Sequence, residues 1–180
     1  SGWVAAPGIL VTNAHVVAGE SDTRVETDGN APGMPAEVLD FDPHDDIAVL
    51  RVPGLRLRPL SLASSAPAGA SGAILGYPED GPFDAQPGRV GQTLKVQTEN
   101  AYGQGPVLRA VTQLRGLVRP GNSGGPVIGS AGQVLATVFA AIASPNARHG
   151  GFAVPNALVR AQLRVAQSRR ASVSTGACAG

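Results

Sequence analysis

Charged residues and cysteine are scarce in this chain of 180 residues. Asp, Glu, Lys and Arg make up 15% of it, whereas soluble proteins typically carry about 25%. No apolar run reaches the roughly 18 residues that a membrane-spanning helix requires. A single cysteine, Cys178, excludes an internal disulfide. The sequence contains neither a clustered set of Cys and His nor a His-Glu-x-x-His pattern, which are patterns that predict metal sites. We therefore expect no metal and no other cofactor.

Glycine and proline are abundant, with 24 and 15 residues, and 43% of the chain is hydrophobic. The hydrophobic content is enough to bury a core, which argues against intrinsic disorder. Chain-turning residues between short apolar segments favour many short strands joined by tight turns over a helical bundle. The length is that of one domain. We therefore expect a single all-β domain.

Two sets of short strands are predicted, separated by a Pro-, Ser- and Ala-rich connection at residues 56–70. The predicted strands are residues 2–5, 9–12, 23–26, 37–41, 47–52, 73–78, 89–96, 107–111, 127–128, 134–141 and 151–154. An apolar stripe with helical spacing then predicts a C-terminal helix over residues 156–167, with Asn156 as its cap. A small-residue tail, residues 168–180, follows.

The net charge of +1 conceals an uneven distribution. Residues 1–46 hold nine of the thirteen acidic residues and one base, whereas residues 100–180 hold eight arginines and no acidic residue. A basic face for nucleic acid or anionic lipid is one interpretation. The other is that the arginines are scattered over separate strands and the terminal helix. The lack of interleaved aromatic residues favours the second, so we expect no nucleic-acid partner.

The segment Gly121-Asn122-Ser123-Gly124-Gly125-Pro126 places a serine in a turn of small residues. An acyl-transfer serine requires such a turn, because the turn's own amides must point at the developing oxyanion. The amides of Gly121 and Ser123 are the candidates for this oxyanion hole. An ordinary glycine-rich turn is the alternative interpretation of the segment taken alone.

A serine nucleophile needs an adjacent base, and the chain has three histidines. His15 follows an apolar strand, where its side chain can project into a cleft. His44 stands in a charged loop and His149 in a polar one, so both are expected to be solvated. Asp46 directly precedes the apolar run at residues 47–50 and is the candidate to orient His15. Taken singly, each of these residues has a more ordinary interpretation.

Taken together, three blocks resemble the catalytic blocks of trypsin-like serine proteases. They are Thr12-Asn13-Ala14-His15-Val16-Val17, Asp46-Ile47-Ala48-Val49-Leu50 and the glycine-rich segment, in the family's order of His, Asp and Ser. The resemblance implies a chymotrypsin-like fold of two six-stranded antiparallel β-barrels, with residues 1–55 in the first and 71–155 in the second. It also implies a catalytic triad of His15, Asp46 and Ser123, an oxyanion hole at Gly121 and Ser123, and hydrolysis of protein or peptide substrates through an acyl-enzyme.

Finer details are similar to bacterial members of the family. Thr-Asn-Ala-His and Gly-Asn-Ser look HtrA-like, but too few residues follow the predicted helix for a PDZ domain. The composition and Cys178 look most like the actinobacterial, membrane-anchored periplasmic proteases of the MarP type. This likeness implies an extracytoplasmic location, a tether and a first barrel strand upstream of Ser1, a disulfide from Cys178 to an upstream cysteine, and a role in envelope stress or acid resistance. We expect the isolated domain to be a monomer.

The resemblance also places a primary substrate pocket. Its base, six residues before the serine, falls at Leu117, with Phe139, Ala140 and Ala141 flanking it and Gly151 opposite. No acidic residue stands at the base, which disfavours Lys or Arg there. We expect a medium-sized apolar or uncharged residue before the scissile bond.

Two competing functions remain open at the level of sequence. One is a non-catalytic binding module on a protease fold, although such domains usually lose a triad residue. The other is a metal hydrolase that uses His15, His44 and the aspartates at 40–46, although the usual metal-binding patterns are missing.

Overall fold

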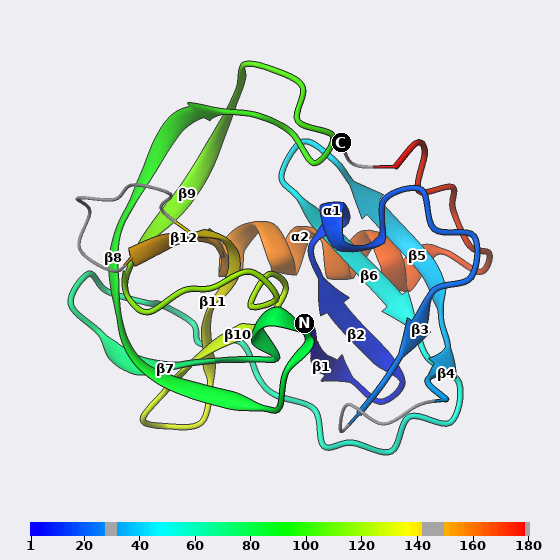
Figure 1. Ribbon diagram of the computed structural model, residues 1–180, viewed down its shortest axis with the longest axis horizontal. Coiled ribbons are helices and arrows are strands. Elements are labelled where there is room, and N and C mark those ends of the chain that lie inside the picture. Colours follow the sequence, from blue (N-terminus) through cyan, green and yellow to red (C-terminus); the bar gives the residue numbers. More distant parts are fainter. Residues whose placement is uncertain (28–31, 142–149, 179–180) are drawn as a thin grey trace.

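The computed structural model describes residues 1–27, 32–141 and 150–178 (Figure 1). Strands dominate it, and one long helix lies near the C-terminus. The N-terminal half contains β1 (Trp3–Ala6), β2 (Ile9–Thr12), α1 (Ala14–Val17), β3 (Arg24–Val25), β4 (Met34–Pro35), β5 (Glu37–Asp42) and β6 (Ile47–Arg51). The C-terminal half contains β7 (Ser71–Gly76), η1 (Pro78–Asp80), β8 (Asp84–Thr98), β9 (Val107–Gly116), β10 (Pro126–Gly129), β11 (Val134–Ala141), β12 (Gly150–Pro155) and α2 (Asn156–Ser168). The predicted all-β class with a C-terminal helix is confirmed.

The N-terminal half divides its six strands between two sheets. Four of them form an antiparallel sheet in the order β1-β2-β6-β5, and β3 pairs with β4 in a separate ribbon. The turn Pro7-Gly8 joins β1 to β2, and Gly8 has a φ of 70°, which a residue with a Cβ rarely adopts. β6 lies inside the sheet and is buried from Ile47 to Leu50, as its continuous apolar run predicts.

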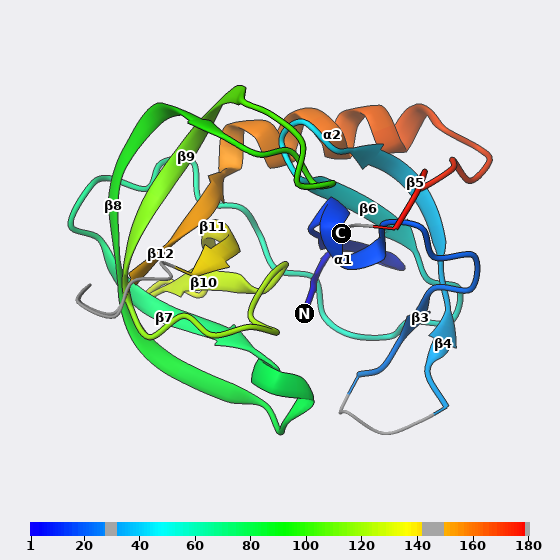
Figure 2. The same ribbon diagram turned by 45° about the horizontal axis from the view of Figure 1, so that its top comes forward.

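The C-terminal half closes into a six-stranded barrel in the order β10-β11-β12-β9-β8-β7. β8 and β9 are its longest strands, and their far ends reach toward the N-terminal half (Figures 1 and 2). Closure removes free strand edges from this half, since each strand has two neighbours. The expected barrel geometry is therefore complete in this half, whereas the strands of the first half do not form one continuous ladder among the described residues.

The two halves share part of their core. Trp3, Val11 and Ile47 from the first half pack in one cluster with Phe139 and Val159 from the second. The indole Nε1 of Trp3 also donates a hydrogen bond of 3.1 Å to Thr137 Oγ1 on β11, and both residues are buried. Apolar burial and a satisfied buried donor thus fix one half against the other.

Helix α2 packs against β5 and β6 on one side and β11 and β12 on the other, which braces both halves (Figure 2). The prediction that Asn156 caps this helix is wrong. Its side-chain amide instead donates to the carbonyl oxygens of Val134 at 2.8 Å and Ala63 at 3.2 Å, and the cap position falls on Pro155. The buried amide therefore ties the start of α2 to β11 and to the inter-barrel connection, a role that local spacing does not reveal.

The acidic first part and the arginine-rich last part of the chain meet in space. Arg169, just after α2, pairs with Asp40 on β5 at 3.2 Å. Within the C-terminal half, Arg119 pairs with Asp84 at the start of β8. Other arginines lie on β9 and on α2. The arginines are thus spread over separate elements. Among the described residues, no helix is long and apolar enough to cross a membrane.

Candidate active site

His15 and Asp46 meet because β2 and β6 are neighbours. His15 lies in α1, which begins two residues after β2, and Asp46 directly precedes β6; the register pairs Thr12 with Ala48. Both residues therefore stand at the same end of the sheet. His15 Nδ1 lies 2.8 Å from Asp46 Oδ2, and the His15 backbone N–H donates to Asp46 Oδ1 at 2.9 Å. The carboxylate contacts both the ring and the main chain of the histidine, which fixes the ring's orientation.

Asp46 is held in an unusual backbone conformation, with a φ of 58°. A residue other than glycine adopts this left-handed region at some cost, and active sites often contain such residues. The side-chain amide of Asn13 donates to the Asp46 carbonyl at 2.8 Å, which stabilises the conformation. Asp46 is 2% exposed, so its carboxylate is shielded from water while it binds His15.

Ser123 stands in a tight turn between β9 and β10 in which Gly121 has a φ of 88°. A Cβ at position 121 would lie 2.5 Å from the carbonyl oxygen of Tyr77, so only glycine fits there. Among the described residues, the amides of Gly121 and Ser123 have no protein acceptor. Their role as oxyanion donors stays a prediction. The Ser123 hydroxyl donates to the carbonyl oxygen of Phe139 at 3.3 Å, and no hydrogen bond joins it to His15.

Ser1, which the sequence did not single out, binds the same turn. Its hydroxyl donates to the Gly121 carbonyl at 2.6 Å and accepts from the Tyr77 backbone N–H at 2.9 Å. Its own carbonyl accepts a hydrogen bond of 2.7 Å from Thr12 Oγ1 on β2. Ser1 therefore links the candidate oxyanion turn to β7 and to the strand that leads into His15. In the sequence, this residue is a serine directly before Gly2-Trp3, and serine is too common a residue to indicate a functional role by itself.

The predicted pocket residues come from two strands and from the segment after β9. Phe139, Ala140 and Ala141 end β11, and Gly151 pairs with Ala141 across to β12. Phe139 is buried, whereas Ala140 is half-buried and Ala141 is exposed. Leu117 is half-buried in the segment that follows β9.

Val118 is a pocket candidate that the sequence did not identify. A Cβ at Gly151 would lie 2.9 Å from Val118 Cγ2 and 2.4 Å from the carbonyl oxygen of Ala140. Val118 is 9% exposed and belongs to the core of the C-terminal barrel. The glycine therefore leaves room beside Val118 that no other residue would leave.

Arg109 is a third residue that sequence reasoning missed. It lies on β9, is 6% exposed, and its guanidinium carbon is 4.3 Å from the centre of the Phe139 ring. Burial lowers the pKa of the Arg109 guanidinium, and the nearby carboxylates of Asp46, Asp45 and Asp42, in that order, oppose this change.

The other singled-out residues lie away from this arrangement. His44 pairs with Asp45 at 3.0 Å and is exposed, as expected for a solvated loop. His149 lies outside the described residues. Cys178 is free and exposed, beside Gly19 in the loop after α1, where a Cβ on the glycine would lie 2.6 Å from its Sγ. Among the described residues, no three His, Cys, Asp or Glu side chains are grouped as a metal site would need.

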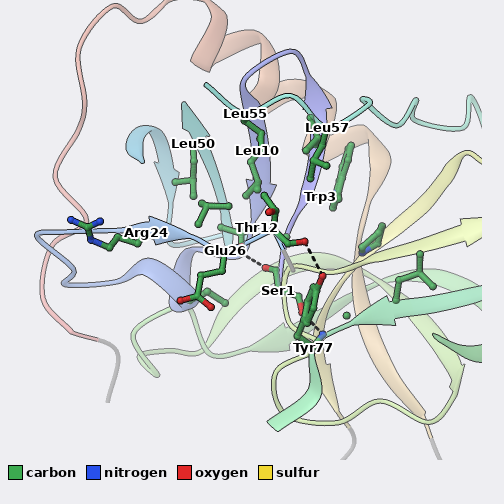
Figure 3. A pocket seen from close by; sticks show the side chains of 18 of the residues that line it. Ser1, Trp3, Leu10, Thr12, Arg24, Glu26, Leu50, Leu55, Leu57 and Tyr77 are labelled. Atoms are coloured by element: carbon green, nitrogen blue, oxygen red, sulfur yellow. Dashed lines mark hydrogen bonds between the residues drawn. The ribbon is translucent and has the colours of Figure 1, made fainter. Parts of the chain in front are cut away.

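A separate cavity of 630 Å³ lies between the β1-β2 edge, the β3-β4 ribbon and η1 (Figure 3). Leu10, Leu50, Leu55 and Leu57 line one wall, and Tyr77 lies across from them. None of the three triad candidates lines it. β1 has only β2 as a neighbour among the described strands, so the cavity adjoins an unpaired sheet edge. The strand that the resemblance implies upstream of Ser1 stays a prediction.

Comparison with known proteins places these features in context. A family description, trypsin-like peptidase domain, matches residues 1–136. Serine protease Rv3671c of Mycobacterium tuberculosis is 39% identical in an alignment of 180 positions that covers 99% of this chain and 44% of that protein. Protease Do-like 1, chloroplastic, of Arabidopsis thaliana is 33% identical in an alignment of 154 positions that covers 82% of this chain and 34% of that protein. The chain thus spans less than half the length of these relatives.

Solved structures show the same likeness. The crystal structure of the active form of the Rv3671c protease from M. tuberculosis has a TM-score of 0.89 at 38% identity, over 99% of this chain and 78% of that one. The HtrA-type protease AlgW with a decapeptide has a TM-score of 0.78 over 93% of this chain and 51% of that one. Its identity of 24% supports a shared fold alone.

Proposed function

This chain belongs to the trypsin-like peptidases, and from that premise we propose that it is a serine endopeptidase whose triad is His15, Asp46 and Ser123. The observation that carries the proposal is the doubly hydrogen-bonded contact between Asp46 and His15. A buried carboxylate that holds Nδ1 leaves Nε2 as the proton acceptor, which is the tautomer a serine hydrolase requires.

The mechanism follows from these groups. Ser123 Oγ turns from the Phe139 carbonyl toward His15, which takes the hydroxyl proton as the oxygen attacks the scissile carbonyl. The amides of Gly121 and Ser123 donate to the oxyanion of the tetrahedral intermediate. His15 then gives its proton to the leaving amine, an acyl-enzyme forms on Ser123, and water releases it by the reverse sequence. Asp46 stabilises the imidazolium and stays ionised throughout.

Reaction with a fluorophosphonate probe and hydrolysis of casein test the proposal. The wild-type chain is expected to be labelled, whereas Ser123→Ala is not, and His15→Ala is labelled far more slowly. Casein cleavage should be lost in both variants. Chelators should leave casein cleavage by the wild-type chain unchanged. A folded wild-type chain that neither reacts nor cleaves would refute the proposal.

A non-catalytic binding module is the second candidate, and one observation favours it. The Ser123 hydroxyl is bonded to Phe139 rather than to the base. Catalytic hydrogen bonds are often long or misaligned before substrate binds, so the geometry alone does not decide. Probe labelling separates the two functions because only an activated serine reacts.

Specificity, location and biological role extend the proposal. The uncharged side chain of Leu117, at the predicted base of the primary substrate pocket, supports cleavage after an apolar residue. The likeness to a mycobacterial serine protease, and to a Chlamydia pneumoniae protein named as a probable periplasmic endoprotease, supports an extracytoplasmic location. A membrane tether, a disulfide at Cys178 and a role in envelope stress or acid resistance complete the proposal. Cell fractionation and the acid survival of a deletion strain test the location and the role.

A further inference from the structure

The turn at residues 119–122, which carries the Gly121 amide, is held through its carbonyl groups. The Pro120 carbonyl accepts a hydrogen bond of 2.9 Å from the Glu79 backbone N–H in η1. The Arg119 carbonyl accepts one of 3.0 Å from the Asn122 backbone N–H, which closes the turn. These two contacts fix the peptide groups on either side of Pro120.

One of these peptide groups contains the candidate oxyanion donor, because the Pro120 carbonyl and the Gly121 amide belong to the same group. A trans peptide group is planar, so its C=O and N–H bonds point in opposite directions. By binding the carbonyl end, the Glu79 N–H therefore fixes the direction of the Gly121 N–H. If that contact were lost, the peptide group could rotate and turn its N–H away from the oxyanion.

The backbone of η1 is in a conformation that needs outside support. Glu79 and Asp80 have φ values of 57° and 55°, which residues with a Cβ adopt at some cost. Such a segment keeps its conformation only where its surroundings determine it. Gly121 packs closely against it, since a Cβ at that position would lie 2.7 Å from the Glu79 backbone nitrogen. Contacts between η1 and the turn therefore have to offset the cost of the η1 backbone.

Arg119 supplies a side-chain contact between the turn and this region. Its Nη2 pairs with Oδ2 of Asp84, the first residue of β8 and the fourth after η1. Gln86 Nε2 donates to both oxygens of Asp84, at 2.9 and 3.2 Å, which holds the carboxylate in place. The Arg119 Nε is buried and has no partner among the described residues, so the guanidinium depends on Asp84.

We propose that Arg119 is a positioning residue whose pairing with Asp84 keeps the turn at residues 119–122 against η1. Glu79 then holds the Pro120 carbonyl, and the Gly121 N–H stays directed at the oxyanion. This inference rests on the proposed oxyanion hole. The two side chains of the pair are 33% and 23% exposed, and ion pairs near the surface contribute little to the free energy of unfolding. The pair should therefore affect catalysis more than global stability.

Arg119→Met tests the proposal, because it removes the charge but keeps an apolar stem. In hydrolysis of a peptide amide, we expect kcat to fall about tenfold, less than the loss caused by deleting an oxyanion donor. KM should stay within about twofold, since the lost contact acts on the transition state. Affinity for a peptidyl trifluoromethyl ketone, whose adduct with Ser123 carries an oxyanion, should fall by the same factor as kcat. The midpoint of urea unfolding should stay close to that of the wild type.

Matched variants separate the ion pair from packing. Arg164→Met removes an exposed arginine of α2 and should leave kcat and inhibitor affinity unchanged. Arg119→Lys keeps a charge that can pair with Asp84, so it should recover most of the lost kcat. Arg119→Glu and Asp84→Arg each place like charges together, and the double variant that combines them should be roughly tenfold more active than either alone. Arg119→Gln serves as the neutral variant if Arg119→Met fails to fold.

Hydrogen exchange of the Glu79 amide reports on the same contact without turnover. Its bond to the Pro120 carbonyl should protect it, and NMR should show roughly tenfold faster exchange in the neutral variant than in Arg164→Met. Equal exchange and equal kcat in these two variants overturn the inference. A kcat loss of the same size in Arg119→Lys also overturns it, since charge pairing would then not explain the loss. The proposed function fails separately, if the wild-type chain shows no hydrolysis that depends on Ser123, and the exchange measurement remains readable in that case.

Discussion

The hydroxyl of Ser123 donates its hydrogen bond to the carbonyl oxygen of Phe139, at 3.3 Å. The proposed base and its proposed orienting acid, by contrast, contact each other directly, with His15 Nδ1 2.8 Å from Asp46 Oδ2. The proposed triad therefore requires the Ser123 hydroxyl to exchange the Phe139 carbonyl for His15 as its acceptor. The proposed acid–base pair is thus in direct contact, whereas the proposed nucleophile is hydrogen-bonded elsewhere.

Asp46→Asn tests the assembled pair. The substituted amide would donate to His15 Nδ1 and stabilise the wrong tautomer, so Nε2 could no longer accept the serine proton. We expect kcat to fall about 10⁴-fold, the loss that this substitution causes in the chymotrypsin-like template, with little change in KM. Steady-state hydrolysis of a peptide ester or amide measures it.

Asp45→Asn is the matched control, because Asp45 binds His44 rather than His15. It should keep kcat within about threefold of the wild-type value, as expected for a group outside the reacting set. If Asp46→Asn retained kcat to a similar degree, Asp46 would not be the orienting residue.

Ser1→Ala tests the link between the N-terminal segment and the oxyanion turn. The variant leaves the Gly121 carbonyl and the Tyr77 amide without the hydroxyl that binds both. We expect kcat to fall by about tenfold to a hundredfold, somewhat less than the loss of one oxyanion donor, because the turn is loosened rather than deleted. KM should change little, since the substrate-binding strands are untouched.

Ser1→Thr should restore most of this loss, because it keeps the hydroxyl. Ser172→Ala removes an exposed hydroxyl in the C-terminal tail and should have no effect. Equal activity of Ser1→Ala and Ser172→Ala would mean that Ser1 does not support the turn.

The sequence predicted the parts of this site that depend on local pattern. Short apolar runs predicted most strands. The order of three short motifs singled out His15, Asp46 and Ser123, and the structure brings His15 and Asp46 into contact, while the catalytic roles stay a prediction. It did not predict contacts made across the fold. Ser1 is 120 residues from Gly121, and the contact between Arg109 and His44 spans 65 residues. Nothing in either local segment indicates its partner.

Asn156 is a residue for which the local pattern predicted a wrong role. Its position before an apolar stripe is typical of a helix cap, yet its amide binds two distant carbonyl groups instead. Tertiary hydrogen bonds outweighed the local preference, because Asn156 is 7% exposed and a buried side-chain amide without acceptors costs more than a helix cap contributes.

Leu117→Asp tests the predicted base of the primary pocket. The wild-type chain should prefer medium-sized apolar residues before the scissile bond in a peptide library. The variant places a carboxylate where Leu117 is half-buried, so it should gain cleavage after Lys or Arg and lose cleavage after apolar residues. One charge pair in a partly desolvated pocket should shift the ratio of kcat/KM values by roughly tenfold or more.

Gly151→Ala provides an independent check on the same pocket. Its added methyl group would press on the Ala140 carbonyl and on Val118, so activity on larger residues should fall first. If the wild-type chain cleaved mainly after Arg or Lys, Leu117 would not form the base of the primary substrate pocket.

The buried carboxyl group of Asp40 makes the free energy of unfolding depend on pH in a predictable direction. Asp40 lies on β5 and is 2% exposed. One of its oxygens is 3.2 Å from Arg169, and the other has no partner among the described residues. Burial raises the pKa of Asp40 above its ordinary value of 3.8, and Arg169 opposes this in part. The folded state therefore binds this proton more tightly than the unfolded state does.

The Asp40 contribution to the free energy of unfolding should consequently fall as pH rises from about 4 through the raised pKa, and stay lower above it. Asp40→Asn is uncharged at every pH and escapes this loss, so its stability relative to wild type should be greater at pH 7 than at pH 4. The change amounts to about 1.4 kcal/mol for each unit by which the folded pKa exceeds the unfolded one. Urea unfolding followed by the fluorescence of buried Trp3 measures it, with the exposed Asp22→Asn as control. A buried carboxyl group with a raised pKa must lower the free energy of unfolding as it deprotonates. A stability difference between Asp40→Asn and wild type that is constant with pH, or smaller at pH 7, would therefore contradict the argument.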